Sequence, residues 1–99
     1  MGVDTHARNH VYTILAATGA LVDAAEFPNT PAGITRTIAW VARRTDADAD
    51  VLWVIEGAAS YGAALTAAVI SASYPVAEAP RMDAKSRYGI GKSDFLDSP

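Results

Sequence analysis

The feature that most restricts the fold of this chain is its most hydrophobic run, residues 51–55, which lies between Asp50 and Glu56. A short continuous apolar run with charged ends is typical of a central strand that is buried on both faces of a sheet. The rest of the chain must therefore supply strands beside this segment and helices over it.

Three segments that precede this run have the composition of strands: residues 1–5, 10–16 and 21–27. The second is rich in β-branched and aromatic residues, which favour strands. Turn-forming residues at 8–9 and 18–19 separate the three segments. A parallel return needs a dozen or more residues, so these short connections predict an antiparallel meander.

A helix is expected after the third strand, over residues 31–44. Thr30 can cap it through its side-chain oxygen, and Pro31 fits the first helical position, where no backbone N–H is required. The helix should end near Arg44, because residues 45–50 alternate Asp with Ala and have no apolar face. Its predicted buried face consists of Ile34, Ile38, Val41 and Ala42.

A second helix is expected after a tight exit at residues 57–60, with Ser60 as its cap. Residues 74–77 are expected to form a fifth strand, and a last helix should begin near Ser93. Three antiparallel strands followed by right-handed crossovers predict one α/β domain, a five-stranded mixed sheet flanked by helices. This is the plan of ribonuclease-H-like folds. The predicted buried stripe of the second helix is Tyr61, Leu65, Ala68, Val69 and Ala72.

Four acidic residues are the candidate catalytic and metal-binding groups: Asp4, Glu56, Asp94 and Asp97. In the predicted sheet the first and fourth strands are neighbours, so Asp4 and Glu56 should face each other at one edge. Asp94 and Asp97, three positions apart, share a face if that segment is helical. Clustered carboxylates repel one another unless cations bind them, and Mg²⁺ or Mn²⁺ prefers such oxygen ligands. Two such ions could support cleavage of a phosphodiester bond.

Each acid also has a structural interpretation. Asp4 could cap a turn at the end of a strand, and Glu56 could pair with an arginine. Asp94 and Asp97 could occupy the first turn of a helix, where carboxylates favour the helix dipole. The metal-site hypothesis therefore depends on the four residues meeting in space.

The charge distribution suggests where nucleic acid could bind. The net charge is −3, so the surface as a whole does not attract a polyanion. The only notable basic segment could contact phosphates, or it could be an ordinary solvated loop. Its four basic residues are Arg81, Lys85, Arg87 and Lys92.

Other classes of site are disfavoured. Cysteine is absent, so disulfides and thiolate metal sites are excluded. His6 and His10 are four positions apart without a third ligand, which does not predict a zinc site. No signal-peptide pattern and no apolar run of about 18 residues is present, so we expect a cytoplasmic protein without a membrane contact.

Four blocks in this order resemble the amino-terminal domain of the DEDD transposases: residues 2–6, 27–33, 56–62 and 91–97. These are bacterial insertion-sequence recombinases that act with a bridge RNA, and their first domain is similar to the RuvC Holliday-junction resolvase. The third block departs from the commoner E-G-T-G-S-Y-G form, because it has alanines at positions 58 and 59.

The resemblance implies that Asp4, Glu56, Asp94 and Asp97 occupy the family's acidic tetrad. It implies Mg²⁺- or Mn²⁺-dependent DNA strand cleavage and transfer during transposition, in a homo-oligomer that binds DNA and a guide RNA. Family members carry a second domain with a catalytic serine, so residues 1–99 are expected to be part of a longer protein and inactive alone.

Three alternatives remain at the level of sequence. The nearest is a stand-alone nuclease of the junction-resolvase type. A second is an ATP-binding domain of the sugar-kinase and actin type, but that class requires a glycine near the first acid and residues 5–8 contain none. The third is a non-catalytic dimerisation module.

Overall fold

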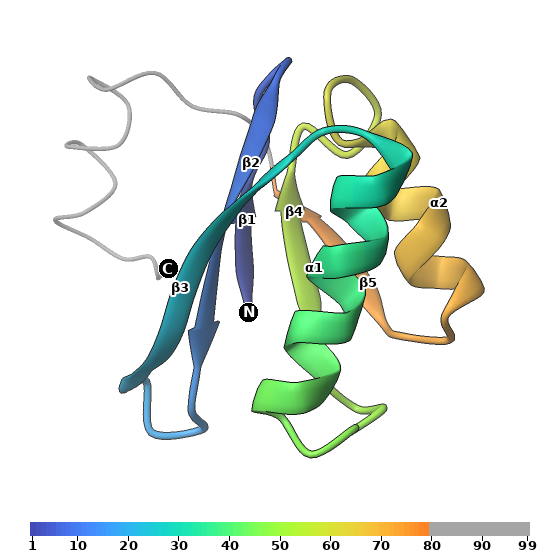
Figure 1. The fold of residues 1–99 in the computed structure, drawn as a ribbon. Helices are drawn as coiled ribbons and strands as arrows, with labels where there is room; N and C mark the ends of the chain where they lie inside the picture. The colour runs from blue at the N-terminus through green and yellow to red at the C-terminus, as the bar shows by residue number, and fades with distance from the viewer. Residues whose placement is uncertain (80–99) are drawn as a thin grey trace, which may run out of the picture.

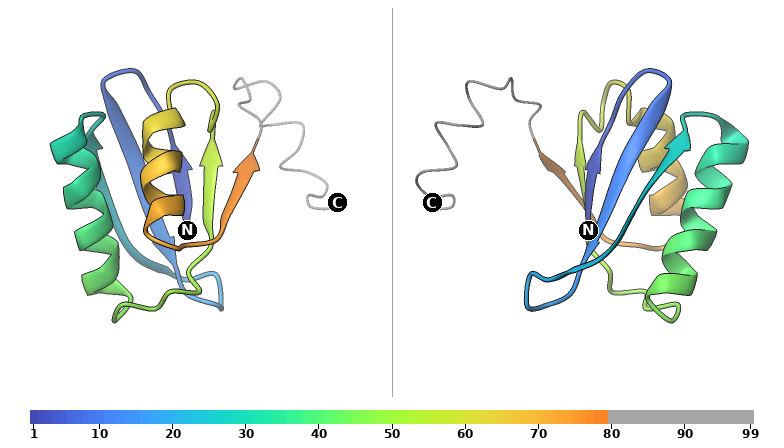
Figure 2. Two further views of the ribbon diagram at one scale, coloured as in Figure 1. Left: turned by 90° about the vertical axis from the view of Figure 1, so that its right-hand side faces the viewer. Right: turned by 60° about the vertical axis from the view of Figure 1, so that its left-hand side comes forward.

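A computed structural model of the chain describes residues 1–79, which form one five-stranded sheet and two helices. Both helices lie on the same face of the sheet (Figures 1 and 2). Neither helix is long and apolar enough to span a membrane. In chain order the elements are β1 (Gly2–Asp4), β2 (Asn9–Leu15), β3 (Leu21–Pro28), α1 (Pro31–Arg44), β4 (Trp53–Glu56), α2 (Ala63–Ser71) and β5 (Val76–Ala79).

The strand order is β3-β2-β1-β4-β5. β1, β2 and β3 form the predicted antiparallel meander, whereas β4 pairs in parallel with both β1 and β5. The turn between β2 and β3 depends on Gly19, whose φ of 88° lies in the left-handed region. The predicted mixed sheet of a ribonuclease-H-like fold is confirmed, with the first and fourth strands side by side.

Helix α1 begins and ends where its capping residues predict. The Thr30 hydroxyl accepts a hydrogen bond from the Gly33 N–H at 3.0 Å, and Pro31 occupies the first turn. The predicted buried face is only partly right, because Ile38 and Ala42 are half-buried. Thr37 is buried instead, and its hydroxyl donates to the Gly33 carbonyl at 2.8 Å. The residues of α1 that are buried are Gly33, Ile34, Thr37, Trp40 and Val41.

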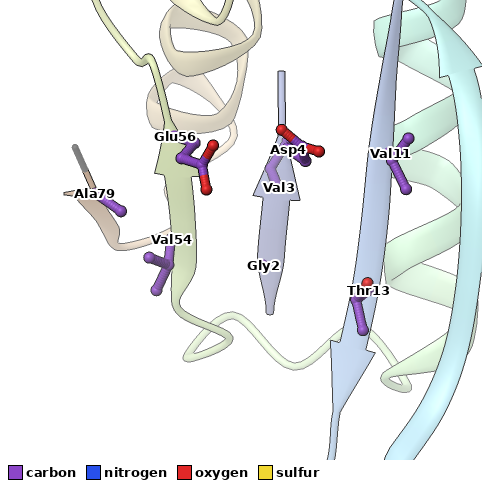
Figure 3. Close-up of a pocket in the computed structure, with 8 residues that line it drawn as sticks. All are labelled: Gly2, Val3, Asp4, Val11, Thr13, Val54, Glu56 and Ala79. Carbon is purple, nitrogen blue, oxygen red and sulfur yellow. The ribbon is translucent and has the colours of Figure 1, made fainter. Parts of the chain in front are cut away.

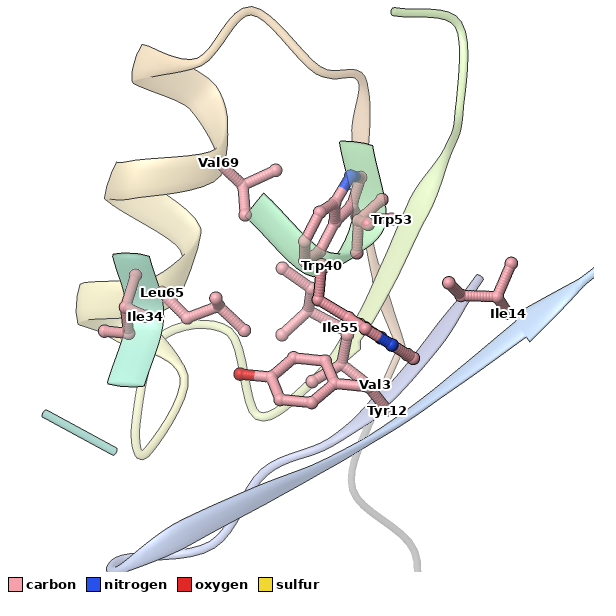
Figure 4. Packing of buried hydrophobic residues seen from close by; sticks show 10 residues of the cluster. Val3, Tyr12, Ile14, Ile34, Trp40, Trp53, Ile55, Leu65 and Val69 are labelled. Atoms are coloured by element: carbon pink, nitrogen blue, oxygen red, sulfur yellow. The ribbon is translucent and has the colours of Figure 1, made fainter. Parts of the chain in front are cut away.

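The core lies between the sheet and the two helices (Figure 4). Its centre is an aromatic group in which Tyr12 lies 6.3 Å from Trp40 and 6.5 Å from Trp53, measured between ring centroids. Phe27 of β3 packs against Trp40 at 5.7 Å. The Trp40 indole packs against Tyr12 and Phe27 of the sheet, so Trp40 lies in the centre of the core and Ile38 lies at its edge, half-buried.

Four further predictions about the second half are wrong in detail. β4 is not buried on both faces, because Val54 is only half-buried on the face away from the helices. The residue that caps α2 is Gly62, not Ser60, and Tyr61 in the predicted stripe is 51% exposed. β5 begins at Val76, after Pro75, rather than at residue 74.

Of the predicted stripe of α2, only Leu65 and Val69 are buried. Ala68 is half-buried and packs against the core, whereas Ala72 lies after the last helical residue and is exposed. A helix of nine residues covers the sheet with about two turns, which explains why its contact stripe is short.

Candidate active site

The face of the sheet that α1 and α2 leave open carries a hollow of about 380 Å³ (Figure 3). Its floor is formed by β1, β2, β4 and β5, and most of the side chains that line it point away from the helices. Most are small or apolar, and the two carboxylates lie at the carboxyl ends of their strands. The lining residues are Gly2, Val3, Asp4, Val11, Thr13, Val54, Glu56 and Ala79.

Asp4 and Glu56 are brought together as predicted. β1 and β4 pair in parallel with Val3 opposite Ile55, so the next residue of each strand continues the same register. Neighbouring strands are about 4.8 Å apart. Alternation then directs the Asp4 and Glu56 side chains to the same face, where both line the hollow.

The two oxygens of Asp4 have different surroundings. Oδ2 lies 3.1 Å from Nε2 of His6, and the Asp4 side chain as a whole is 38% exposed. Oδ1 is buried and has no hydrogen-bond partner within residues 1–79. A buried carboxylate oxygen without a partner is costly unless a ligand or cation compensates it.

Thr5 joins the ends of the two strands on the opposite face. Its side chain is fully buried, and its hydroxyl donates a hydrogen bond of 2.6 Å to the backbone carbonyl of Glu56. This contact fixes the end of β1 against the end of β4. Together with the pairing of β1 and β4, it holds the backbones of Asp4 and Glu56 next to each other.

The loop that follows Glu56 explains the third sequence block. Gly57 has a φ of 65°, and its carbonyl accepts hydrogen bonds from the N–H groups of Ser60 and Gly62 at 3.0 and 2.9 Å. A Cβ on Gly62 would lie 2.9 Å from Cγ2 of Thr5. The two glycines thus allow a tight turn that packs closely beside the strand ends. Ala58 and Ala59, which replace the residues of the commoner E-G-T-G-S-Y-G sequence, lie within this turn.

Asn29 is a residue whose role the sequence did not reveal. Its side-chain amide donates to the carbonyl of Ala7 at 3.3 Å and to the carbonyl of Tyr61 at 3.2 Å. It therefore links the β1–β2 loop to the loop before α2, the two loops next to the acidic pair. The only signal was its place in the block of residues 27–33, because the contact joins segments distant in sequence.

The remaining predicted site residues lie outside the described part of the chain. These are the acids Asp94 and Asp97 and the basic residues Arg81, Lys85, Arg87 and Lys92. Within residues 1–79, no group of three or more His, Asp or Glu side chains could hold a metal ion. The described part of the site is thus a carboxylate pair with one adjacent imidazole.

Comparison with protein families decides the kind of protein. The family model of the IS110-type DEDD transposases, described as a transposase, matches residues 1–98. The chain belongs to this family. Membership gives it a DNA-processing role of the transposase kind, with DNA as substrate, and DEDD transposases are in general metal-dependent. No curated protein matches the chain.

Proposed function

We propose that the IS110-type domain supplies the acidic site for DNA strand cleavage and transfer, with Mg²⁺ or Mn²⁺ held by Asp4, Glu56, Asp94 and Asp97. The observation that carries this proposal is the buried Oδ1 of Asp4, which has no partner within residues 1–79, in a residue that lines the same hollow as Glu56. Carboxylate oxygens at the ends of adjacent parallel strands are the donors that hard divalent cations prefer.

The roles of the chain's own residues follow from their positions. Asp4 lies on β1 between β2 and β4, so it is the best placed of the acids to be shared by two ions. Thr5 holds the end of β1 against the end of β4 through its hydrogen bond to Glu56, and Gly62 allows the following turn to pack closely against Thr5. The bound cations would neutralise the carboxylates and stabilise the entering and leaving oxygens of the phosphodiester.

The hollow suits an extended nucleic-acid strand that approaches from the open face of the sheet. The described floor has no basic side chain, so the contacts to DNA phosphates are assigned to Arg81, Lys85, Arg87 and Lys92. A guide RNA and a homo-oligomer of the longer protein complete the proposed assembly. Residues 1–99 alone should not recombine DNA.

The first experiment is a Mn²⁺ and Mg²⁺ titration of the thermal unfolding of the protein and of its Asp4→Asn variant. At a metal concentration 100 times the dissociation constant, binding to the native state adds about 2.7 kcal/mol to the free energy of unfolding. Wild type should show this gain, and Asp4→Asn should lose most of it.

A matched control is Asp50→Asn, because Asp50 is exposed and lies before β4, at the end of the sheet opposite Glu56. This variant should respond to metal as wild type does. In the full-length transposase, Asp4→Asn and Glu56→Gln should abolish metal-dependent cleavage of the element's own DNA ends. Equal metal responses of wild type and Asp4→Asn would refute the proposed site.

A further inference from the structure

His6 lies on the same face of the sheet as Asp4. Side chains alternate along an extended segment, so Asp4 and His6 point one way and Thr5 points the other, into the core. The His6 side chain is 52% exposed, and its Nε2 approaches Oδ2 of Asp4 to 3.1 Å. This is a direct side-chain contact to an acid of the proposed metal site.

The contact with Asp4 determines which nitrogen of the His6 imidazole carries a hydrogen. A carboxylate oxygen only accepts hydrogen bonds, so Nε2 of His6 must carry a hydrogen and donate it to Oδ2. The same nitrogen then has no lone pair available for a cation. In this orientation Nε2 of His6 acts on the carboxylate and cannot itself bind a cation.

The backbone of His6 is hydrogen-bonded to the side chain of His10. The His6 N–H donates to Nδ1 of His10 at 3.1 Å, and His10 is fully buried on β2. Its ring meets Tyr12 edge-on, with the ring centroids 6.2 Å apart. The two histidines therefore connect the core to Asp4 through successive contacts.

We infer that His6 is a positioning residue for Asp4. By occupying Oδ2, its imidazole stops the carboxylate from rotating and leaves Oδ1, the buried oxygen without a partner within residues 1–79, to bind the divalent cation. This inference rests on the proposed function, because it assigns the cation to Asp4. Outer-shell partners of this kind typically change metal affinity by about 10- to 100-fold.

The test compares His6→Ala with His6→Gln in the full-length transposase, using calorimetric titration with Mn²⁺ and with Mg²⁺ in the absence of DNA. Glutamine can place an amide N–H near the position of Nε2, so it retains the donor. His6→Ala should weaken binding of both metals about tenfold. His6→Gln should recover most of that loss, and the ratio of the two affinities should stay at the wild-type value.

Three results would overturn the inference. If His6→Ala binds metal as wild type does, His6 does not position Asp4. If both variants lose affinity equally and lose Mn²⁺ more than Mg²⁺, His6 is itself a nitrogen ligand, because imidazole favours the softer ion. If wild type and Asp4→Asn bind metal equally, the proposed function fails and this inference fails with it.

Discussion

Gly33→Ala tests how closely α1 must approach β3. Gly33 is buried in the first turn of α1, and a Cβ there would lie 2.9 Å from the carbonyl carbon of Pro28 and closer still to its oxygen. Ordinary carbon contacts are about 3.5–4.0 Å, so backbone atoms and not a flexible side chain would have to move. Overpacking of this kind costs about 1–3 kcal/mol, and a backbone obstacle places Gly33→Ala at the upper end.

Helix propensity works in the opposite direction. Alanine is about 1 kcal/mol more favourable than glycine within a helix, so propensity alone predicts that Gly33→Ala stabilises the protein. Subtracting this gain from about 3 kcal/mol leaves a net destabilisation of about 2 kcal/mol. At an unfolding entropy of about 0.2 kcal/mol/K for a domain of this size, Tm should fall by about 10 °C.

Urea unfolding and calorimetry of Gly33→Ala, with Ala39→Gly as control, measure the two terms separately. Ala39 lies on the exposed side of α1, so its replacement reports propensity without a clash and should cost about 1 kcal/mol. A Gly33→Ala protein as stable as wild type, or more stable, would refute the close approach of α1 to Pro28. It would also remove our explanation of the glycine in the block of residues 27–33.

Two further predictions concern the strand ends and the pH dependence of stability. Thr5→Val removes the 2.6 Å hydrogen bond to the Glu56 carbonyl and should lower the free energy of unfolding, measured in urea, by about 1–2 kcal/mol. The control Thr35→Val, on the exposed side of α1, should change the free energy of unfolding little. Equal effects of the two variants would contradict a special role for Thr5. The pKa of Asp23 is lowered from 3.8, chiefly by the N–H of Ala24 and further by Trp40 and Arg44 of α1. The contribution of Asp23 to the free energy of unfolding is therefore complete above pH 3.8 and is lost as the pH falls through the folded-state pKa. Asp23→Asn should reduce the loss of unfolding free energy between pH 5 and 2.5. The same loss in the variant as in wild type would contradict this assignment.

The parts of the fold that depend on local chemistry could be predicted from the sequence. The bounds of α1 follow from a capping threonine, a proline in the first turn and the absence of an apolar face after Arg44. The antiparallel meander follows from turns too short for a crossover. The pairing of β1 with β4, and hence the meeting of Asp4 with Glu56, follows from the fold class once these elements are known.

The parts that depend on distant contacts could not be predicted. Trp40 lies at helical spacing from the buried residues Gly33 and Thr37, so the period of α1 is compatible with its burial. Its aromatic partners Tyr12 and Phe27 lie on distant strands and could not be read from α1 itself. Serine is a common helix-capping residue, but the Ser60 hydroxyl donates a hydrogen bond to the Gly57 carbonyl at 3.2 Å and helps to close the turn.

In the site, too, some residues could be predicted from local sequence and others could not. The four acids are predicted because each follows an apolar segment or has a partner three positions away, and of these the structure describes Asp4 and Glu56. The roles of Asn29, Gly62 and His6 depend on loops that meet only in the folded chain. Sequence patterns therefore suggested which charged groups to consider, but not which groups contact Asp4 and the strand ends.

The most direct test of the central claim is to locate Mn²⁺ by paramagnetic broadening of the amide signals of the isotopically labelled protein. We predict that the signals of Val3, Asp4 and Glu56 broaden first as Mn²⁺ is added, and that Asp4→Asn removes this effect. The competing acidic segment, residues 46–50, lies before β4, at the opposite end of that strand from Glu56. Broadening confined to residues 46–50, with the ends of β1 and β4 unaffected, would contradict the claim that the acidic pair binds the metal.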